Sequence, residues 1–366
     1  MSRVLFAGGG TGGHLYPALA LAAALKQEKP GTEVHFVGAR RGVEARVLPN
    51  EQQPHTLLPF EPLRRDRVWQ NWRLVPSLFN SVRGLRKLFG EFRPQLVVGT
   101  GGYASAPACL YAVARGIPVA VQEQNSHAGL TTRALSRWAR QVHLGFPEAR
   151  RYLKPGKQTE ITTLGNPIRP PDPGIDRYAA RARFGLKPDS KVVLVVGGSQ
   201  GSRAINEAVL AALQPTHGLE ILWVTGPAHL DSINSRLPEH AKTFVRTVGY
   251  INHMPEALAA ADVAISRAGA MATAELLAWG IPALLIPLPT AAADHQTHNA
   301  RALAEAGAAV MLTERELTPE QLWRELLRVT NDATTRNRMA AAARERARPH
   351  AARDISRRLA ELLERA

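Results

Sequence analysis

The stretch VLFAGGGTGGH, residues 4–14, decides the fold, because an apolar strand runs into a glycine-rich loop and then into an alanine-rich helix, residues 15–25. The same order returns later in the chain, where the strand VVLVV is followed by GGSQGS, residues 197–202, and a second alanine-rich helix. A glycine-rich turn at a helix N-terminus presents backbone N–H groups at the positive end of the helix dipole, which favours phosphate. The two copies therefore predict two phosphorylated ligands.

The repetition extends beyond these loops. In each half a second apolar strand leads through a loop of small residues into a helix that stops at Gly-Ile-Pro, within residues 96–118 and 263–282. Glycine ends the helix and proline opens an extended segment. Continuous apolar strands that alternate with helices indicate parallel sheets buried on both faces. We therefore expect an α/β protein of two doubly wound, Rossmann-like domains that face each other across a cleft.

The length and the proline content place the domain boundary. A chain of 366 residues is too long for one compact core and suits two domains. The densest proline cluster, NPIRPPDP at residues 166–173, lies between the two copies. Proline stiffens extended structure and removes backbone donors, which is typical of a linker. We expect a first domain at residues 1–165 and a second at residues 166–350.

Composition limits the cell compartment and the partners. The 46 Lys and Arg residues exceed the 31 Asp and Glu residues and give a net charge of +15, which attracts nucleic acid, anionic lipid or acidic substrates. The single cysteine, Cys109, excludes an intrachain disulfide. No segment has the composition of an export signal or approaches ~20 uninterrupted apolar residues. These features predict a soluble cytoplasmic protein.

Residues 64–93 form a basic stripe with eight Lys and Arg residues against Asp66 and Glu91. Its apolar residues recur at the spacing of one helix face. One interpretation is that this face packs on its own domain; the other is that it rests on an anionic membrane surface. Both hold if only part of the face is buried. The apolar residues are Trp69, Trp72, Val75, Leu78, Phe79, Val82, Leu85 and Phe89.

The first glycine-rich loop allows more than one chemistry. Gly8-x-Gly10-x-x-Gly13 is the pattern of dinucleotide-binding folds, but the acidic residue expected ~20 positions later is missing. The pair Arg40-Arg41 suits a 2′-phosphate, so an NADP-dependent oxidoreductase stays an alternative. His14 follows the loop and either caps the turn or serves as a general base near neutral pH.

The second half offers groups for a phosphorylated sugar donor. Ser199 and Arg169 suit a phosphate. Glu275 is expected in the first turn of its helix, where it either caps the helix or accepts hydrogen bonds from the two hydroxyls of a ribose. The polar run Asp294 to Asn299 lies where a ligand is expected. The sequence has no Asp-x-Asp pair and no clustered metal-ligand spacing, so we expect no metal and no cofactor.

Together these motifs closely resemble one family. The resemblance spans residue 4 to about residue 310, and the ordered set is far more specific than any one motif. The family is MurG, the undecaprenyl-diphospho-muramoylpentapeptide N-acetylglucosaminyltransferases of bacterial cell-wall synthesis. The segments that carry the resemblance are GGTGGH, GTGGYASAP, QEQN at residues 122–125, GNPIR at residues 165–169, GGSQGS, SRAGAMATAE and DHQTHNA.

The resemblance implies a glycosyltransferase of the GT-B type whose second domain holds UDP-N-acetylglucosamine and whose first domain holds a lipid-linked acceptor. It also implies that the last helix, within residues 351–366, returns to the first domain. In one departure from the family, the hydroxyl of Thr273 is shifted by one place. The implied donor site contains Thr11, Gly12, Gly13, Asn125, Arg169, Ser199, Ile251, Ala270, Met271, Ala272, Thr273, Ala274, Glu275 and Gln296. The implied acceptor site contains Gly10, Gly101, Gly102 and Tyr103.

The reaction implied by the resemblance is transfer of N-acetylglucosamine to the 4-hydroxyl of the muramoyl sugar of lipid I, which gives lipid II with inversion. Inversion requires a base for the acceptor hydroxyl, and His14 is the first candidate and Glu123 the second. A lipid-linked acceptor also favours a peripheral position on the anionic cytoplasmic face of the cell membrane. The predicted membrane residues are Trp69, Trp72, Val75, Leu78, Phe79 and Val82.

A nucleic-acid-binding protein without enzymatic activity is the contrasting hypothesis. It rests on the net charge of +15 alone. The sequence contains no recognised nucleic-acid-binding module, and apart from the basic stripe it lacks interleaved aromatic residues for base stacking. We therefore expect no nucleic-acid partner.

Overall fold

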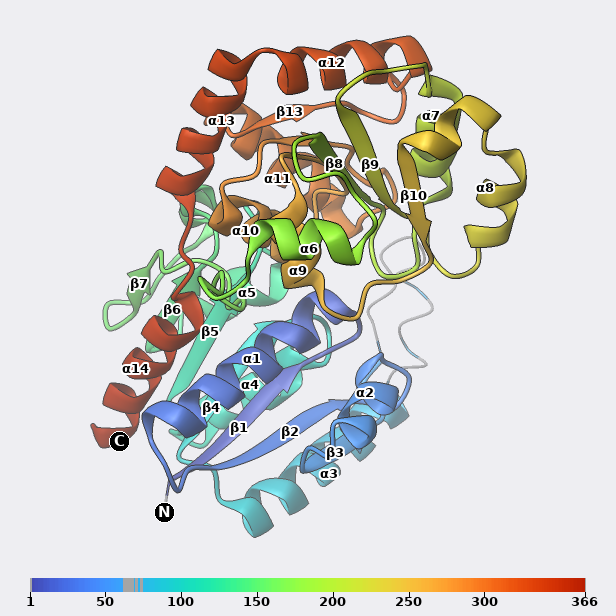
Figure 1. Ribbon diagram of the computed structural model, residues 1–366. Coiled ribbons are helices and arrows are strands. Elements are labelled where there is room, and N and C mark those ends of the chain that lie inside the picture. Colours follow the sequence, from blue (N-terminus) through green and yellow to red (C-terminus); the bar gives the residue numbers. More distant parts are fainter. Residues whose placement is uncertain (1, 62–68, 70–71, 73–74, 366) are drawn as a thin grey trace. The chain divides into compact units, whose positions relative to one another are not determined.

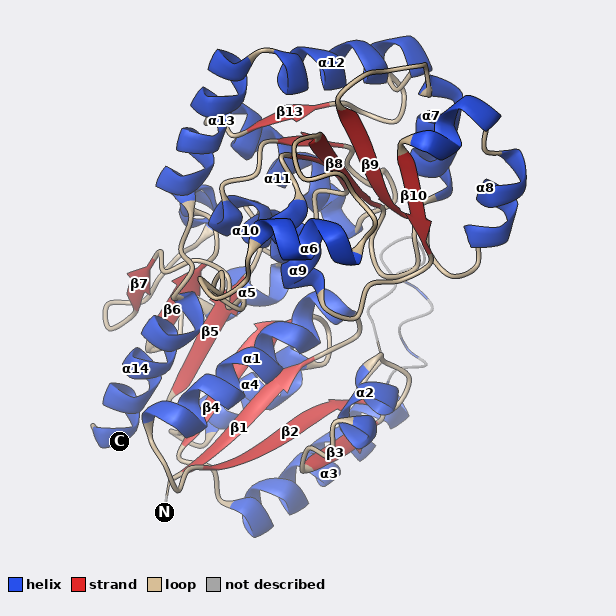
Figure 2. Cartoon of the chain, viewed as in Figure 1, coloured by secondary structure: helices blue, strands red, loops and turns tan. Residues whose placement is uncertain are grey.

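The computed structural model describes residues 2–61, 69, 72 and 75–365 (Figure 1). It divides into two compact units, Met1–Arg169 with Arg348–Ala366, and Pro170–Ala347. We call these the first and second unit. Strands and helices alternate along most of both units, and the last three helices follow one another without a strand between them; Figure 2 distinguishes the two by colour.

The first unit is built on a parallel sheet of seven strands in the order β3-β2-β1-β4-β5-β6-β7. Its strands are β1 (Arg3–Gly8), β2 (Glu33–Ala39), β3 (His55–Leu58), β4 (Leu96–Gly101), β5 (Val119–Glu123), β6 (Gln141–Leu144) and β7 (Glu160–Thr162). Its α-helices are α1 (Gly12–Glu28), α2 (Glu44–Asn50), α3 (Val75–Phe92), α4 (Ser105–Ala114), α5 (Leu130–Leu135) and α14 (Ala351–Glu364).

The second unit repeats this plan with six parallel strands in the order β10-β9-β8-β11-β12-β13. Its strands are β8 (Lys191–Val196), β9 (Leu219–Val224), β10 (Val245–Val248), β11 (Val263–Ser266), β12 (Ala283–Leu285) and β13 (Ala309–Met311). Its α-helices are α6 (Arg177–Arg183), α7 (Arg203–Ala212), α8 (Leu230–Arg236), α9 (Met254–Ala260), α10 (Ala270–Trp279), α11 (His295–Glu305), α12 (Pro319–Asn331) and α13 (Ala333–Arg346).

The two sheets confirm the predicted pair of doubly wound domains. In each sheet the strand order reverses next to the central strand, between β1 and β4 in the first unit and between β8 and β11 in the second. The Gly-Ile-Pro helix ends also match the prediction, since Gly116 and Gly280 have φ of 70° and 65°, the left-handed values that favour glycine. The inner strands of both sheets are almost entirely buried, as their continuous apolar sequences require, whereas the edge strands β3, β7, β10 and β13 are only partly buried.

Strands of the first unit present alternate side chains to two cores. Leu5 contributes to the core beneath α3, α4 and α5, while Phe6 contributes to the core beneath α1 and α14. Helix α14 is amphipathic and buries Ile355, Leu359 and Leu363 at a spacing of four residues in that second core. The last helix is therefore part of the first unit, although about 180 residues of the second unit precede it in sequence.

Helix α3 buries only part of its apolar face. Leu85 and Leu88 are buried in the core of the first unit, and the Phe89 ring meets the Tyr111 ring with centroids 4.8 Å apart. Nearer the start of the helix, Phe79 is 69% exposed and Val82 is 46% exposed. The packing interpretation thus holds for Leu85, Leu88 and Phe89, and the membrane interpretation stays a prediction for the exposed Phe79 and Val82.

Candidate functional site

The predicted site residues of each unit follow the carboxyl ends of strands, and several of them follow the central strands. In the first unit, β1 leads into the loop that precedes α1, and the neighbouring β4 leads into Gly101 to Tyr103. In the second unit, β8 leads into residues 197–202 and the neighbouring β11 leads into Arg267. In open α/β sheets, ligands bind at the carboxyl ends of strands where the strand order reverses. Each unit therefore has one candidate site at this position, and we call these the first and the second half-site.

Close backbone approach explains the glycines of the first half-site. Gly10 has φ of 86°, and a Cβ there would lie 2.7 Å from the ring of Tyr103. Gly102 has φ of 78°, and a Cβ there would overlap the carbonyl oxygen of Gly9. A Cβ at Gly101, φ 96°, would lie 2.8 Å from the His14 ring. The two loops thus fit together only without side chains at these positions.

His14 is held between the two loops. Its Nδ1 lies 3.1 Å from the Thr11 hydroxyl, and its backbone carbonyl accepts a 2.8 Å hydrogen bond from Thr100. The ring is partly exposed and packs against Gly101 and Gly102. A histidine whose ring is oriented by a hydroxyl at its Nδ1 suits proton transfer, because the orientation is fixed before substrate arrives.

Glu123, the second predicted base, is used differently. It is 3% exposed, and Oε1 accepts a 3.0 Å hydrogen bond from the Asn125 N–H while Oε2 accepts a 2.9 Å bond from the Gly129 N–H. Gln122 and Gln124 beside it are also buried and are linked to Asn166, which donates to the Gln124 carbonyl at 3.0 Å. This arrangement favours a role for Glu123 in closing the loop that carries Asn125.

Two further groups of the first unit have shifted proton affinities. Burial, with the nearby Glu44 and Glu61 carboxylates, raises the pKa of Tyr103. Burial also raises the pKa of Cys109 to about 12, although Ser105 lies within hydrogen-bonding distance of the thiol. Neither side chain is therefore ionised near neutral pH, and Cys109 is not a nucleophile.

The loop of the second half-site is anchored by a buried arginine. Ser202 is the N-cap of α7 and accepts a hydrogen bond from the Ile205 N–H at 3.3 Å. Arg267, 9% exposed, donates to the Ser202 hydroxyl at 2.7 Å and to the carbonyls of Ile286 and Pro287 at 3.1 and 3.0 Å. Gly198 and Ser199 remain exposed, so this loop presents its backbone to solvent.

Helix α10 begins earlier than the sequence indicated. Gly269 is its N-cap and Ala270 its first residue, so Glu275 lies in the second turn; the predicted first-turn position is wrong. Thr273 is 1% exposed and its hydroxyl donates to the backbone carbonyls of Gly269 and Ala270. This hydroxyl satisfies its own helix, whereas Met271, Ala272, Ala274 and Glu275 are partly exposed.

The segment before α11 contains strained backbone. Ala293 and Asp294 both have φ of 53°, a left-handed conformation that is costly for residues with a Cβ. Gln296 follows and its side-chain oxygen accepts a 3.0 Å hydrogen bond from the Leu288 N–H. Such strain is concentrated at ligand-binding sites, which agrees with the predicted role of this polar run. Ile251, another predicted donor-site residue, is 8% exposed.

The predicted donor-site residues belong to both units. Ser199, Ile251, Gln296 and the first residues of α10 lie in the second unit. The first unit contains the remaining members of the set. These are Thr11, Gly12, Gly13, Asn125 and Arg169, of which Arg169 is exposed at the very end of the unit.

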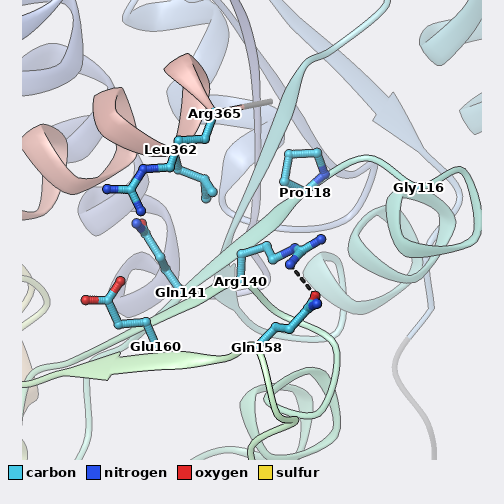
Figure 3. Close-up of a pocket in the computed structure, with 8 residues that line it drawn as sticks. All are labelled: Gly116, Pro118, Arg140, Gln141, Gln158, Glu160, Leu362 and Arg365. Carbon is cyan, nitrogen blue, oxygen red and sulfur yellow. Dashed lines mark hydrogen bonds between the residues drawn. The ribbon is translucent and has the colours of Figure 1, made fainter.

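A pocket of about 410 Å³ lies elsewhere in the first unit (Figure 3). Pro118 and Gln141 line it at the amino ends of β5 and β6, whereas Glu123 ends β5 at the opposite edge of the sheet. Arg140 and Gln158 in this pocket are hydrogen-bonded to each other. The pocket contains none of the predicted site residues.

The membrane prediction concerns α3 and the residues before it. Trp69 and Trp72 are 72% and 66% exposed. The Val75 and Leu78 side chains lie outside what the structure describes. Within the described part of the chain, no helix has the length and apolar character needed to cross a bilayer. Among the same residues, no group of three or more His, Cys, Asp or Glu side chains is arranged to hold a metal ion.

Several residues of the half-sites were not predicted from the sequence. Arg267 directly follows a buried apolar strand. A charged residue is unusual at such a position, so the sequence did contain a signal for Arg267. Asn206 bonds both the Thr225 carbonyl and the indole of Trp223, at 2.8 and 3.0 Å, and so braces the end of β9. Glu44 accepts a hydrogen bond from the Gly10 N–H of the first glycine-rich loop. In the sequence, only the glycines near Glu44 indicate this contact.

Comparisons with known proteins give a consistent result. Residues 4–144 match the glycosyltransferase family 28 N-terminal domain, and residues 192–358 match the C-terminal domain of the same family. UDP-N-acetylglucosamine--N-acetylmuramyl-(pentapeptide) pyrophosphoryl-undecaprenol N-acetylglucosamine transferase of Moorella thermoacetica is 42% identical over 360 residues, 95% of this chain and 96% of that protein. The protein of the same name from Salinibacter ruber is 42% identical over 99% of this chain and 97% of its own length.

Solved structures give the same picture. The crystal structure of Acinetobacter baumannii MurG is 29% identical, with a TM-score of 0.80, over 99% of this chain and 100% of that one. The calicheamicin glycosyltransferase CalG4 is 17% identical, with a TM-score of 0.69, over 100% of this chain and 99% of that one, which shows a shared fold alone.

Proposed function

Because this chain belongs to the MurG family within glycosyltransferase family 28, we propose that it transfers N-acetylglucosamine from UDP-N-acetylglucosamine to the 4-hydroxyl of the muramoyl sugar of lipid I, forming lipid II with inversion. The observation that carries the proposal is similarity along the whole chain, 42% over 95–99% of its residues, to transferases of that name. The family predicted from the motifs is thereby confirmed, and it argues against the oxidoreductase and nucleic-acid alternatives.

We assign the UDP moiety to the second unit and the acceptor to the first. In the second unit the exposed Gly198 and Ser199 precede α7, whose N-terminus carries the positive end of a helix dipole. Glu275 would accept the ribose hydroxyls, and Gln296 would contact the sugar. In the first unit, the loops around Gly10 and Gly102 would hold the acceptor diphosphate.

We propose His14 as the base that takes the proton of the acceptor hydroxyl. Its partly exposed ring is oriented by Thr11 at the carboxyl end of β1, while both oxygens of Glu123 are occupied by backbone donors. As the sugar leaves UDP, negative charge develops on the diphosphate. Backbone N–H groups of the second glycine-rich loop, the dipole of α7 and Arg169 would stabilise that charge.

We also propose that the exposed part of α3 rests on the anionic cytoplasmic surface of the membrane. Phe79 and Val82 are exposed apolar residues, and Arg83, Arg86 and Lys87 on the same helix are exposed cations. Apolar and basic side chains on one helix give the two contributions that interfacial binding combines. The acceptor would then be reached without leaving the bilayer surface.

The activity is tested by release of UDP from UDP-N-acetylglucosamine. The purified protein is expected to release UDP at a substantial rate only when a lipid I analogue is present. Release that does not depend on the acceptor, from a correctly folded protein, would rule out the transfer reaction. A fluorescence change on addition of NADPH would instead revive the oxidoreductase, and salt-sensitive DNA binding without UDP binding would revive the nucleic-acid hypothesis.

Membrane association is tested by co-sedimentation with vesicles. Binding is expected to require anionic lipid and to weaken as salt is raised, because exposed charges are screened. The variant Phe79→Ser/Val82→Ser should bind less, whereas Leu110→Ser, which removes a 44% exposed apolar residue of α4, serves as the matched control. Equal binding by all three proteins would exclude this face of α3.

A further inference from the structure

The buried carboxylate of Glu44 lies behind the first glycine-rich loop. Glu44 is 0% exposed, and its Oε2 accepts a 2.8 Å hydrogen bond from the Gly10 N–H. Its Oε1 accepts a second 2.8 Å bond from the N–H of Ala39, the last residue of β2. Both oxygens therefore accept from backbone donors, as an ionised carboxylate does. One side chain thus joins the end of β2 to the loop after β1.

The surroundings of Glu44 are shaped to hold this group. A Cβ added at Gly9, Gly38 or Gly42 would fall within 3.0 Å of the Glu44 side chain, closer than real Cβ atoms approach. These glycines come from three places, the loop after β1, strand β2 and the turn before α2. A carboxylate enclosed by backbone from three segments has no room to change its position.

The second copy of the fold lacks this feature at its own loop. A Cβ at Gly197 would meet Ser202, and a Cβ at Gly201 would meet the Thr225 carbonyl, so the atoms nearest to these two glycines belong to the backbone and to a serine. The side chain that anchors the second loop is a cation, because Arg267 donates to Ser202 at 2.7 Å. The first loop is thus held by an internal anion, and the second by an internal cation.

We propose that Glu44 is a positioning residue for the acceptor side of the transfer reaction. Its carboxylate takes the Gly10 N–H that a bound phosphate takes in a nucleotide cradle, and it thereby fixes the backbone that leads to Thr11 and His14. The inference rests on the proposed function.

The test is Glu44→Gln in the full chain. Glutamine has the same shape, but its amide N–H₂ must face one of the two backbone N–H donors. We expect kcat/KM for a lipid I analogue to fall about 10- to 100-fold, since misplacement of a reacting group by about 1 Å costs that much. The Kd for UDP, measured by calorimetry, should stay within about twofold of wild type, because the UDP site is assigned to the second unit. Glu44→Asp keeps the charge and should recover part of the acceptor kinetics.

Glu220→Gln is the matched control. Glu220 is 1% exposed in β9 of the second unit and likewise accepts a backbone N–H, from Lys187. This control should lower the melting temperature without changing KM for the acceptor. The proposal is overturned if folded Glu44→Gln has wild-type acceptor kinetics. It is equally overturned if both variants lose activity only in proportion to their loss of stability.

A measurement on the wild-type chain tests the inference without requiring that a variant folds. The Gly10 amide should exchange its hydrogen slowly, because it is bonded to a buried carboxylate. Fast exchange of this amide beside slow exchange of the Ala39 amide would overturn the inference. This outcome differs from failure of the proposed function, which would appear as absence of acceptor-dependent UDP release by the wild-type protein.

Discussion

Replacing Gly102 by alanine tests whether the two loops of the first half-site must be in backbone contact. Gly102 has φ of 78°, and a Cβ there would overlap the Gly9 carbonyl oxygen and lie 3.1 Å from His14 Nδ1. Gly116 is the matched control, since it has a similar φ of 70° but nothing within 4 Å of its Cβ position. The comparison separates the cost of a left-handed alanine from the cost of the overlap.

The expected magnitudes follow from these two terms. A left-handed alanine costs about 1–2 kcal/mol, partly offset by the lower entropy of its unfolded chain, so Gly116→Ala should destabilise by about 1 kcal/mol. Gly102→Ala adds an overlap with fixed backbone, for which overpacking costs of about 1–3 kcal/mol are typical. The total for Gly102→Ala is then about 2–4 kcal/mol. Each kcal/mol corresponds to about 2–4 °C in Tm for a domain of this size.

Activity should separate the two variants more clearly than stability. Relief of the overlap moves the Gly9 backbone away from Gly102 and disturbs His14 between them, so kcat should fall about 100-fold in Gly102→Ala. Gly116→Ala should keep wild-type kcat, because Gly116 lies at the opposite edge of the sheet. Thermal unfolding and acceptor-dependent UDP release measure the two effects. Equal Tm and equal kcat for the two variants would refute the reasoning.

Three further predictions concern other parts of the chain. His14→Ala should lose about 10²–10⁴-fold in turnover while UDP binds as before, and turnover within twofold of wild type would dismiss His14 as the base. Arg267→Ala leaves Glu314 without its ion-pair partner, so it should destabilise the second unit by about 3–5 kcal/mol and weaken UDP binding. Arg236→Ala is the control. It breaks an exposed ion pair with Glu207 and should change neither the stability nor the UDP affinity. Burial, together with the positive charge of Arg358, lowers the pKa of His143 from 6.5 to about 3. As the pH falls below 6.5, His143 is protonated in the unfolded chain but stays neutral in the folded protein. The free energy of unfolding of the first unit should therefore decrease between pH 6.5 and about pH 3, by at most ~4–5 kcal/mol. Urea unfolding at pH 7, 5.5 and 4.5 should show a flatter dependence in His143→Asn; an unchanged pH dependence would contradict this assignment.

The fold was predictable because its signals are local. A strand of continuous apolar residues and the loop that ends it can be identified from neighbouring positions, and the left-handed glycines Gly116 and Gly280 mark helix ends directly. Helix α14 was different, because nothing in its own sequence shows where Ile355 and Leu359 are buried. Only the resemblance to a family indicated its place, since the contacts of α14 with α1 join residues more than 300 positions apart.

The site was predictable only in part, because a residue's partners are set by tertiary structure. The stripe in α3 was treated as one face, yet Phe79 is exposed while Ser81 and Leu85 are buried, because six positions separate Phe79 from Leu85 and place them about 120° apart around the helix. The hydroxyl of Thr273 was expected near the donor, but it lies inside its own helix because α10 starts at Ala270. A shift of one or two residues in the start of a helix changes the surroundings of its first side chains, and sequence patterns do not determine helix starts that closely.

Glu44 shows why duplicated loops can differ in chemistry while they agree in shape. Both loops follow the central strand of a parallel sheet and precede a helix, so sequence similarity alone predicts equal phosphate cradles. A side chain 34 residues from Gly10 changes this, because its carboxylate has already taken the Gly10 N–H. The second loop, anchored through Ser202 by Arg267, keeps an exposed backbone for an anion. The groups behind the two loops therefore differ although the glycine patterns agree: a carboxylate at the first loop, and at the second an arginine that is paired with Glu314.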